Sequence, residues 1–104
     1  MGLGRSSIRP LMEAGEAVLH DDAVDGPYGK TTLVVTTRAF YLNVGGRFVR
    51  YRHEDVRAAT FDVHDIFLAL DGNIVRLKCR QGTAKSPAIQ ALKRQIALHR
   101  FSAA

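Results

Sequence analysis

Short segments in which apolar and polar residues alternate recur along most of this chain. In residues 39–44, for example, Phe40, Leu42 and Val44 share one face, which is the two-residue period of a half-buried β-strand. The two glycines that follow, at 45 and 46, tolerate the positive φ angles of a two-residue hairpin turn. The same reasoning predicts seven strands, over residues 16–20, 31–36, 39–44, 47–52, 56–62, 66–70 and 73–79.

The segments between these strands are too short for a crossover helix, so the sequence predicts an antiparallel meander. The longest of the segments between predicted strands follows the first strand. It begins with residues 21–29, which are rich in Asp, Gly and Pro and are predicted to form a loop. Ser86 and Pro87 predict the start of a helix, because serine caps the first turn and proline loses no hydrogen bond there. An apolar stripe at helical spacing then follows, made of Ile89, Leu92 and Ile96.

A seven-stranded sheet leaves two open edges unless it bends into a barrel or a sandwich, and one terminal helix can cover an open end. The predicted fold class is therefore mainly β: a seven-stranded antiparallel bent barrel capped by one C-terminal α-helix. A length of 104 residues fits one domain. We expect residues 1–10, which offer little to bury, to be a flexible N-terminal segment, and residues 11–101 to form the domain.

The single cysteine, Cys79, excludes an internal disulfide framework and is predicted to be a small buried hydrophobic residue. This cysteine usage fits a reducing compartment, so we expect the protein in the cytoplasm. No apolar run approaches the roughly 20 residues of a transmembrane helix, and we expect no transmembrane segment. The Arg-, Ala- and Val-rich composition is typical of a bacterial protein.

The net charge of +5 is distributed unevenly along the chain. Five of the ten acidic residues lie between Glu13 and Asp25, and none follows Asp71. A field polarised in this way favours anionic partners such as phosphate backbones, acidic lipid headgroups or an acidic protein surface. The alternative, which the sequence leaves open, is a basic domain whose charges serve only solubility.

Basic residues at alternate positions form two ladders, and these are the candidate binding residues. Arg50 and Arg52 share a strand face with Phe48, and a second ladder consists of Arg76, Lys78 and Arg80. Alternation places each set on one side of its strand, where it would either bind anions or form the solvated outer face of a barrel. Two tyrosines among these basic residues, Tyr41 and Tyr51, are predicted to be exposed contact anchors.

The sequence contains no motif that specifies catalysis. Gly29, Lys30 and Thr31 resemble part of a phosphate-binding loop, but Val24 stands where that motif needs glycine, and a strand follows instead of a helix. The four histidines show no metal-ligand spacing and are predicted to be solvated loop residues; they are His20, His53, His64 and His99. We therefore expect no enzyme activity, no cofactor and no metal site.

Five segments together resemble a pleckstrin-homology-like (PH-like) domain of the bacterial or GRAM-like type. They are residues 15–19, 33–42, 51–56, 71–77 and 88–97, so the resemblance covers roughly residues 11–101. The resemblance implies a seven-stranded bent barrel closed at one end by the C-terminal helix. It also implies binding rather than catalysis.

One family feature is missing from this chain. Phosphoinositide-binding members carry basic residues in the first strand and the loop after it, whereas this chain has Asp21, Asp22 and Asp25 there, followed only by Lys30. Carboxylates repel a phosphorylated headgroup, so phosphoinositide binding is not carried over. The functional hypothesis is a small non-catalytic binding or assembly module, with a protein partner, a second copy or an anionic surface as its ligand. The alternative is a nucleic-acid-binding small β-barrel that uses the basic strand faces.

Overall fold

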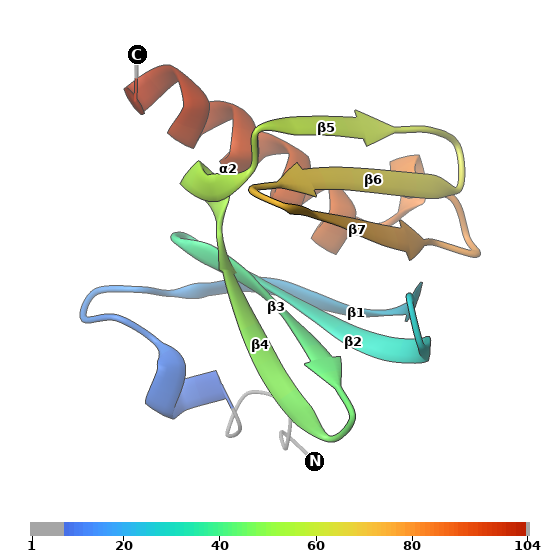
Figure 1. The fold of residues 1–104 in the computed structure, drawn as a ribbon, viewed down its shortest axis with the longest axis horizontal. Coiled ribbons are helices and arrows are strands. Elements are labelled where there is room, and N and C mark those ends of the chain that lie inside the picture. The colour runs from blue at the N-terminus through green and yellow to red at the C-terminus, as the bar shows by residue number, and fades with distance from the viewer. Residues whose placement is uncertain (1–7, 104) are drawn as a thin grey trace.

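The computed structural model describes residues 8–103, which form seven strands, one α-helix and three short 3-10 turns (Figure 1). The predicted seven strands and C-terminal helix are confirmed. The elements are η1 (Arg9–Leu11), β1 (Val18–Gly26), β2 (Gly29–Thr36), β3 (Ala39–Val44), β4 (Arg47–Arg52), η2 (His53–Asp55), β5 (Ala58–Phe61), β6 (Asp65–Leu70), β7 (Asn73–Lys78), η3 (Thr83–Lys85) and α2 (Pro87–Ala103).

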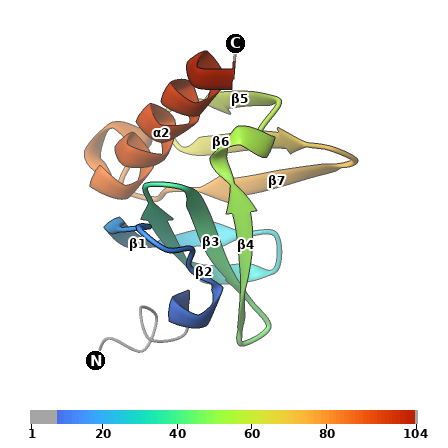
Figure 2. The same cartoon turned by 90° about the vertical axis from the view of Figure 1, so that its left-hand side faces the viewer.

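The strands form one antiparallel sheet in the order β4-β3-β2-β1-β7-β6-β5. The sheet bends at β1, which pairs with β2 over most of its length but with β7 only at Asp25 and Lys78. The two parts of the sheet, β1–β4 and β5–β7, therefore pack against each other as two layers, and α2 runs along one side (Figures 1 and 2). This is the bent, helix-capped arrangement that the sequence predicted.

One continuous core lies between the two parts of the sheet and the helix. The helix contributes Ile89, Leu92 and Ile96, which are all buried as its apolar spacing predicted. Ser86 caps the helix, since its Oγ accepts a hydrogen bond of 3.2 Å from the backbone amide of Ile89. No helix in the described part of the chain is long and apolar enough to cross a membrane.

Strand β1 is longer than predicted, because residues 21–26 continue it instead of forming a loop. Asp21, Asp22 and Asp25 each pair with a residue of β2, and the turn is confined to Pro27 and Tyr28. Aspartate disfavours strands in general, but a full ladder of backbone pairs with β2 outweighs that preference here. The acidic segment is therefore a strand of the sheet and not a separate loop.

A second, smaller core lies on the opposite face of β2 and β3. Ile8 is completely buried there against Val34, Ala39 and Tyr41. Within the segment that was expected to be flexible, residues 1–10, Ile8 therefore packs on the sheet, while Arg9 and Pro10 are exposed and residues 1–7 lie outside the described part of the chain. The segment from Ile8 to β1 covers a face that alternation along β3 had assigned to solvent.

Candidate functional site

Arg50, which belongs to the first basic ladder, is held by acidic groups of the N-terminal segment. Its Nη2 donates hydrogen bonds of 3.0 Å to the Oε1 atoms of both Glu13 and Glu16, and its Nε donates to the hydroxyl of Tyr41 at 3.0 Å. The Glu16 side chain is fully buried and also accepts hydrogen bonds from Thr36 and Tyr41. These contacts fasten the segment before β1 onto β2, β3 and β4.

The same contacts fix the charge state of this buried cluster. Burial alone would raise the pKa of Glu16, but hydrogen bonds from Thr36, Tyr41 and Arg50 outweigh it and hold the pKa below its usual value. Burial, together with the hydrogen bond to Glu16, raises the pKa of Tyr41 to about 12. The cluster is therefore an ionised carboxylate and a guanidinium bridged by a neutral phenol. Its groups satisfy one another, and the Arg50 guanidinium is already paired with the carboxylates of Glu13 and Glu16.

This arrangement corrects the prediction that Tyr41 is an exposed contact anchor, since its side chain is completely buried. The other predicted anchor, Tyr51, is half-buried, and its ring stacks on Phe40 at 5.0 Å between centroids. Arg52 is half-exposed and forms an ion pair with Glu54. The first ladder and its tyrosines thus belong largely to the internal packing of the domain.

The second ladder lies on a sheet face that no described helix or strand covers. The inner side of β5, β6 and β7 faces the core that these strands share with β1–β4 and α2, and their other side faces solvent (Figures 1 and 2). Inward and outward residues alternate on these strands, so one set is largely buried or half-buried and the other is exposed or half-exposed. We call this surface the outer face; it consists of Ala58, Thr60, Asp65, Phe67, Ala69, Ile74, Arg76 and Lys78.

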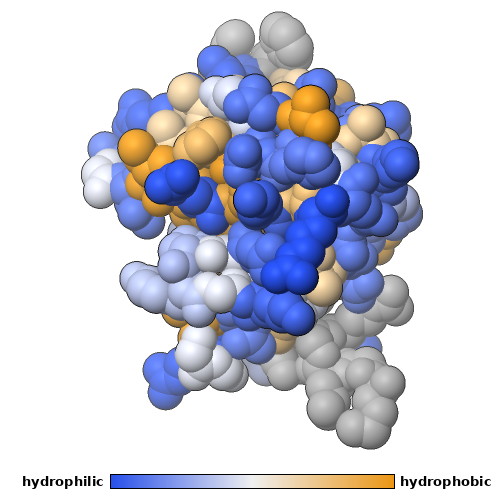
Figure 3. Space-filling view, turned by 90° about the vertical axis from the view of Figure 1, so that its right-hand side faces the viewer, coloured by the Kyte–Doolittle hydropathy of each residue, from blue (hydrophilic) through white to orange (hydrophobic). Residues whose placement is uncertain are grey.

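A groove of about 450 Å³ runs between the outer face and the β1–β2 turn, where Gly26 and Pro27 form its wall. The guanidinium of Arg76 lies over the ring of Phe67, 5.2 Å from its centroid. Ile74, on the same strand, is 63% exposed, although it is a large aliphatic residue. In Figure 3, hydrophobic residues gather at the level of β5–β7, directly beside hydrophilic ones. The groove therefore combines apolar surface with a cation.

Carboxylates accompany the two remaining cations of the ladder. Lys78 is the register partner of Asp25 on β1 and of Asp65 on β6, so two acids flank it on neighbouring strands. Arg80 lies beyond the end of β7, and its Nε donates a 2.9 Å hydrogen bond to Asp25. The face has mixed charge and is not the uniform basic stripe that the β7 sequence suggests when it is read alone.

The sequence prediction did not include two residues of this surface, Phe67 and Ile74. Each lies next to buried apolar residues on its strand, and only strict alternation assigns it outward. This alternation can be recognised in the sequence of residues 66–70 and 73–79. In the first range, for example, Ile66, Leu68 and Leu70 take the inward positions. A half-buried phenylalanine and an exposed isoleucine at outward positions were the cue for a binding surface that the basic residues alone did not supply.

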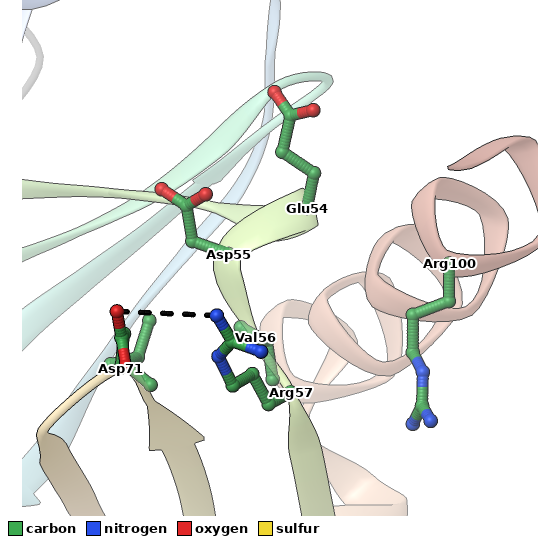
Figure 4. Close-up of a pocket in the computed structure, with 7 residues that line it drawn as sticks. Glu54, Asp55, Val56, Arg57, Asp71 and Arg100 are labelled. Carbon is green, nitrogen blue, oxygen red and sulfur yellow. Dashed lines mark ion pairs between the residues drawn. The ribbon is translucent and has the colours of Figure 1, made fainter. Parts of the chain in front are cut away.

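A larger and more solvated hollow, of about 680 Å³, lies at the other end of the β6–β7 hairpin (Figure 4). Its lining carries both signs of charge, and the residues are Glu54, Asp55, Val56, Arg57, Leu70, Asp71 and Arg100. Arg57 and Asp71 approach to 3.9 Å, and their side chains are 71% and 92% exposed. Pairs this exposed contribute little to stability. Its described lining contains no Ser, Thr, Cys, Lys or His side chain.

The histidine prediction is wrong for His53, which is completely buried in η2, and for His99, which is a partly buried residue of helix α2. Its Nε2 lies 2.8 Å from the carbonyl oxygen of Thr36, and Nε2 of His99 lies 3.0 Å from that of Thr37. Both rings therefore donate to the β2–β3 turn, where they fasten η2 and α2. Among the described residues, no three His, Cys, Asp or Glu side chains converge to hold a metal ion.

Comparison with known proteins supports the fold. A solved structure, the Vps36 N-terminal PH domain, matches with a TM-score of 0.61 and 16% sequence identity, and the match covers 89% of this chain and 88% of that chain. No protein-family model and no curated protein sequence matches. At this level of identity the likeness concerns the fold alone. The chain thus has the PH-like fold that the sequence resemblance implied.

Proposed function

We propose that this PH-like domain is a non-catalytic protein-binding or assembly module and that its outer face is the contact surface. The observation that carries the proposal is the exposed pairing of apolar and charged groups there: Ile74 is 63% exposed, and Arg76 lies over Phe67. Aromatic residues and arginine are enriched at protein interfaces, where they supply most of the binding energy. An exposed apolar patch with a polar rim likewise marks a surface that binds another protein.

The distribution of charge favours a protein over a polyanion as the partner. A phosphate-binding face needs several unpaired cations, because affinity comes from displaced counterions. On this domain Arg50 pairs with two glutamates, Arg80 pairs with Asp25, and Lys78 stands between two aspartates. A mixed-charge partner surface complements this pattern better than a phosphate backbone or a phosphoinositide headgroup does.

A random peptide library displayed on phage tests the proposal without a known partner. We expect peptides selected on the immobilised domain to lose at least about tenfold in affinity when Ile74→Asp places a charge in the apolar centre. Val49→Asp is the matched control, because Val49 is also an exposed strand residue, 38% exposed, but lies on β4. Peptides that are indifferent to Ile74→Asp, or a library that yields no binder, would contradict the proposal.

We further propose that the domain is of the bacterial GRAM-like type and functions in the cytoplasm. Residues 15–19 and 51–56 support the subtype through their resemblance to the opening strand and the post-β4 segment of that family. Cys79, a buried free thiol in the described chain, fits a reducing compartment. Expression in a bacterium, followed by fractionation with an antibody against the domain, tests the location.

A further inference from the structure

We propose that the partner of the outer face is a second copy of this chain, bound across a two-fold axis that passes beside Ile74. This inference rests on the proposed function, since it names the partner of the same surface. Its basis is that opposite charges lie on the two sides of a small apolar centre: Arg76 is on the outer face, and Asp71 is one step beyond its edge, in the β6–β7 turn, where it also lines the larger hollow. A two-fold interface requires this property, because each patch must complement itself.

The register of the sheet arranges the face in rows. Ala58, Ala69 and Ile74 lie side by side on β5, β6 and β7, since Ala58 pairs with Ala69 and Ala69 pairs with Ile74. This row is apolar, and two of its three side chains are single methyl groups. The two alanines are small, so only Ile74, which is 63% exposed and also lines the groove, presents a large side chain in this row.

Charged residues flank the apolar row on each side along the strands. One step towards the C-terminal end of β7 lies the pair of Phe67 and Arg76, which are register partners. One step the other way along β6 lies Asp71, at the β6–β7 turn. Successive residues on one strand face are about 7 Å apart, so Arg76 and Asp71 lie at similar distances from the apolar row.

A two-fold axis through the apolar row therefore brings Arg76 of each chain to Asp71 of the other, while the two Ile74 side chains meet near the axis. Asp71 is available for this contact. Its carboxylate is 92% exposed, and its approach to Arg57 at 3.9 Å is a weak surface pair (Figure 4). The Arg76–Asp71 contact forms twice in such a dimer.

Charge reversal tests this geometry in a way that a general loss of stability cannot imitate. We expect the unaltered chain to dimerise in sedimentation equilibrium between about 1 µM and 1 mM, the range of a weak to moderate interface. Arg76→Asp and Asp71→Arg should each weaken the dimer at least about tenfold, because like charges then face each other twice. Arg47→Asp, an equal charge change on β4, should have no effect.

An equimolar mixture of the Arg76→Asp and Asp71→Arg chains is the decisive sample. Each variant repels itself, but a mixed pair restores an opposite-charge contact at both positions, so a heterodimer should form with close to the original affinity. The double variant should likewise recover its homodimer. Circular dichroism of each variant verifies that the fold is retained.

A chain that stays monomeric up to about 1 mM, or a dimer that survives both reversals, would overturn the inference. Monomers whose outer face still selects peptides sensitive to Ile74→Asp would leave the proposed function standing and exclude only self-association. Monomers whose selected peptides ignore Ile74 would exclude both. A heterodimer that forms only in the mixture would establish the two-fold contact.

Discussion

His53 is a buried titratable side chain, which lies in η2 and contacts both the sheet and the helix. It is fully buried, its ring lies 5.2 Å from that of His99, and it stacks at 6.1 Å on Phe40. Burial lowers the pKa of His53 to about 4, although the Thr36 carbonyl and the Glu16 carboxylate favour the charged form and His99 disfavours it. The native state therefore holds this imidazole neutral.

A neutral buried histidine makes stability depend on pH in a definite direction. The unfolded chain takes up the proton near pH 6.5 but the folded chain only near pH 4, so stability is full above 6.5 and falls as the pH decreases through this window. The loss should reach about 3 kcal/mol by pH 4. When urea titrations are used to measure the free energy of unfolding at each pH, His53→Gln should reduce its dependence on pH between about pH 5 and 6.5. Equal slopes for both proteins would show that His53 does not control acid sensitivity.

Glu13 and Glu16 lie at the same distance from Arg50 but differ in burial, so their contributions to stability can be compared. Both lie 3.0 Å from the guanidinium, but the Glu16 side chain is fully buried and that of Glu13 is 56% exposed. Glu16→Ala should cost about 3 kcal/mol or more, because it leaves Arg50 and Tyr41 without their buried acceptor. Glu13→Ala should cost at most about 1 kcal/mol. If the two variants lowered the urea denaturation midpoint by similar amounts, the result would contradict the different contributions assigned to Glu16 and Glu13.

At the scale of single residues, the sequence predicts correctly which side chains are buried when burial depends only on the alternation along one strand. The prediction is wrong when a segment that is distant in the sequence covers the side chain. Cys79 is buried, as its strand pattern predicted. Tyr41 alternates outward on β3, yet Ile8 and Glu16 cover it from more than twenty residues away. No local pattern contains that contact, so the exposure of Tyr41 was predicted incorrectly.

At the scale of elements, strands with clear turn signals were predicted closely. The bounds of β3 and β4 agree with the sequence prediction, because Gly45 and Gly46 adopt positive φ angles of 61° and 86° in the turn between them. Strand β1 was predicted too short because its aspartates indicate a loop. Two of those carboxylates bind residues far along the chain: Asp22 accepts a 2.8 Å hydrogen bond from Ser86, and Asp25 accepts a 2.9 Å hydrogen bond from Arg80. Such long-range partners carry no signature at positions 21–26.

Helix α2 provides the element-scale prediction. Leu92 is fully buried in the main core, whereas Leu98 on the same helix is 52% exposed. Leu92→Ala should lower the free energy of unfolding by about 2–5 kcal/mol, since it leaves a cavity under the helix. Leu98→Ala should change it by no more than about 0.5 kcal/mol. Urea denaturation of both variants measures the difference, and a midpoint that barely moves for Leu92→Ala would mean that the helix is loosely attached.

At the scale of the whole molecule, the net charge of +5 does not show how acidic and basic residues are distributed over the folded surface. The fold brings acidic β1 beside basic β7, so that Asp25 lies near both Lys78 and Arg80. Sequence position kept these charges more than fifty residues apart, and only the sheet order unites them. The architecture was predictable from local patterns, but this neutralisation depends on long-range pairing and was not.

The charge distribution leads to a last prediction about nucleic acid. We expect single-stranded oligonucleotides to bind modestly at low salt, because Arg76 and the exposed basic residues retain some field, and to dissociate near 0.15 M salt, where screening acts within about 8 Å. Reversing Arg76, Lys78 and Arg80 together should abolish even this binding while the thermal midpoint stays nearly constant, since all three side chains are exposed. Fluorescence anisotropy at increasing salt measures both effects. A tight complex that survives at physiological salt would mean that the aspartates do not neutralise the ladder, and it would make nucleic-acid binding the better account of this domain.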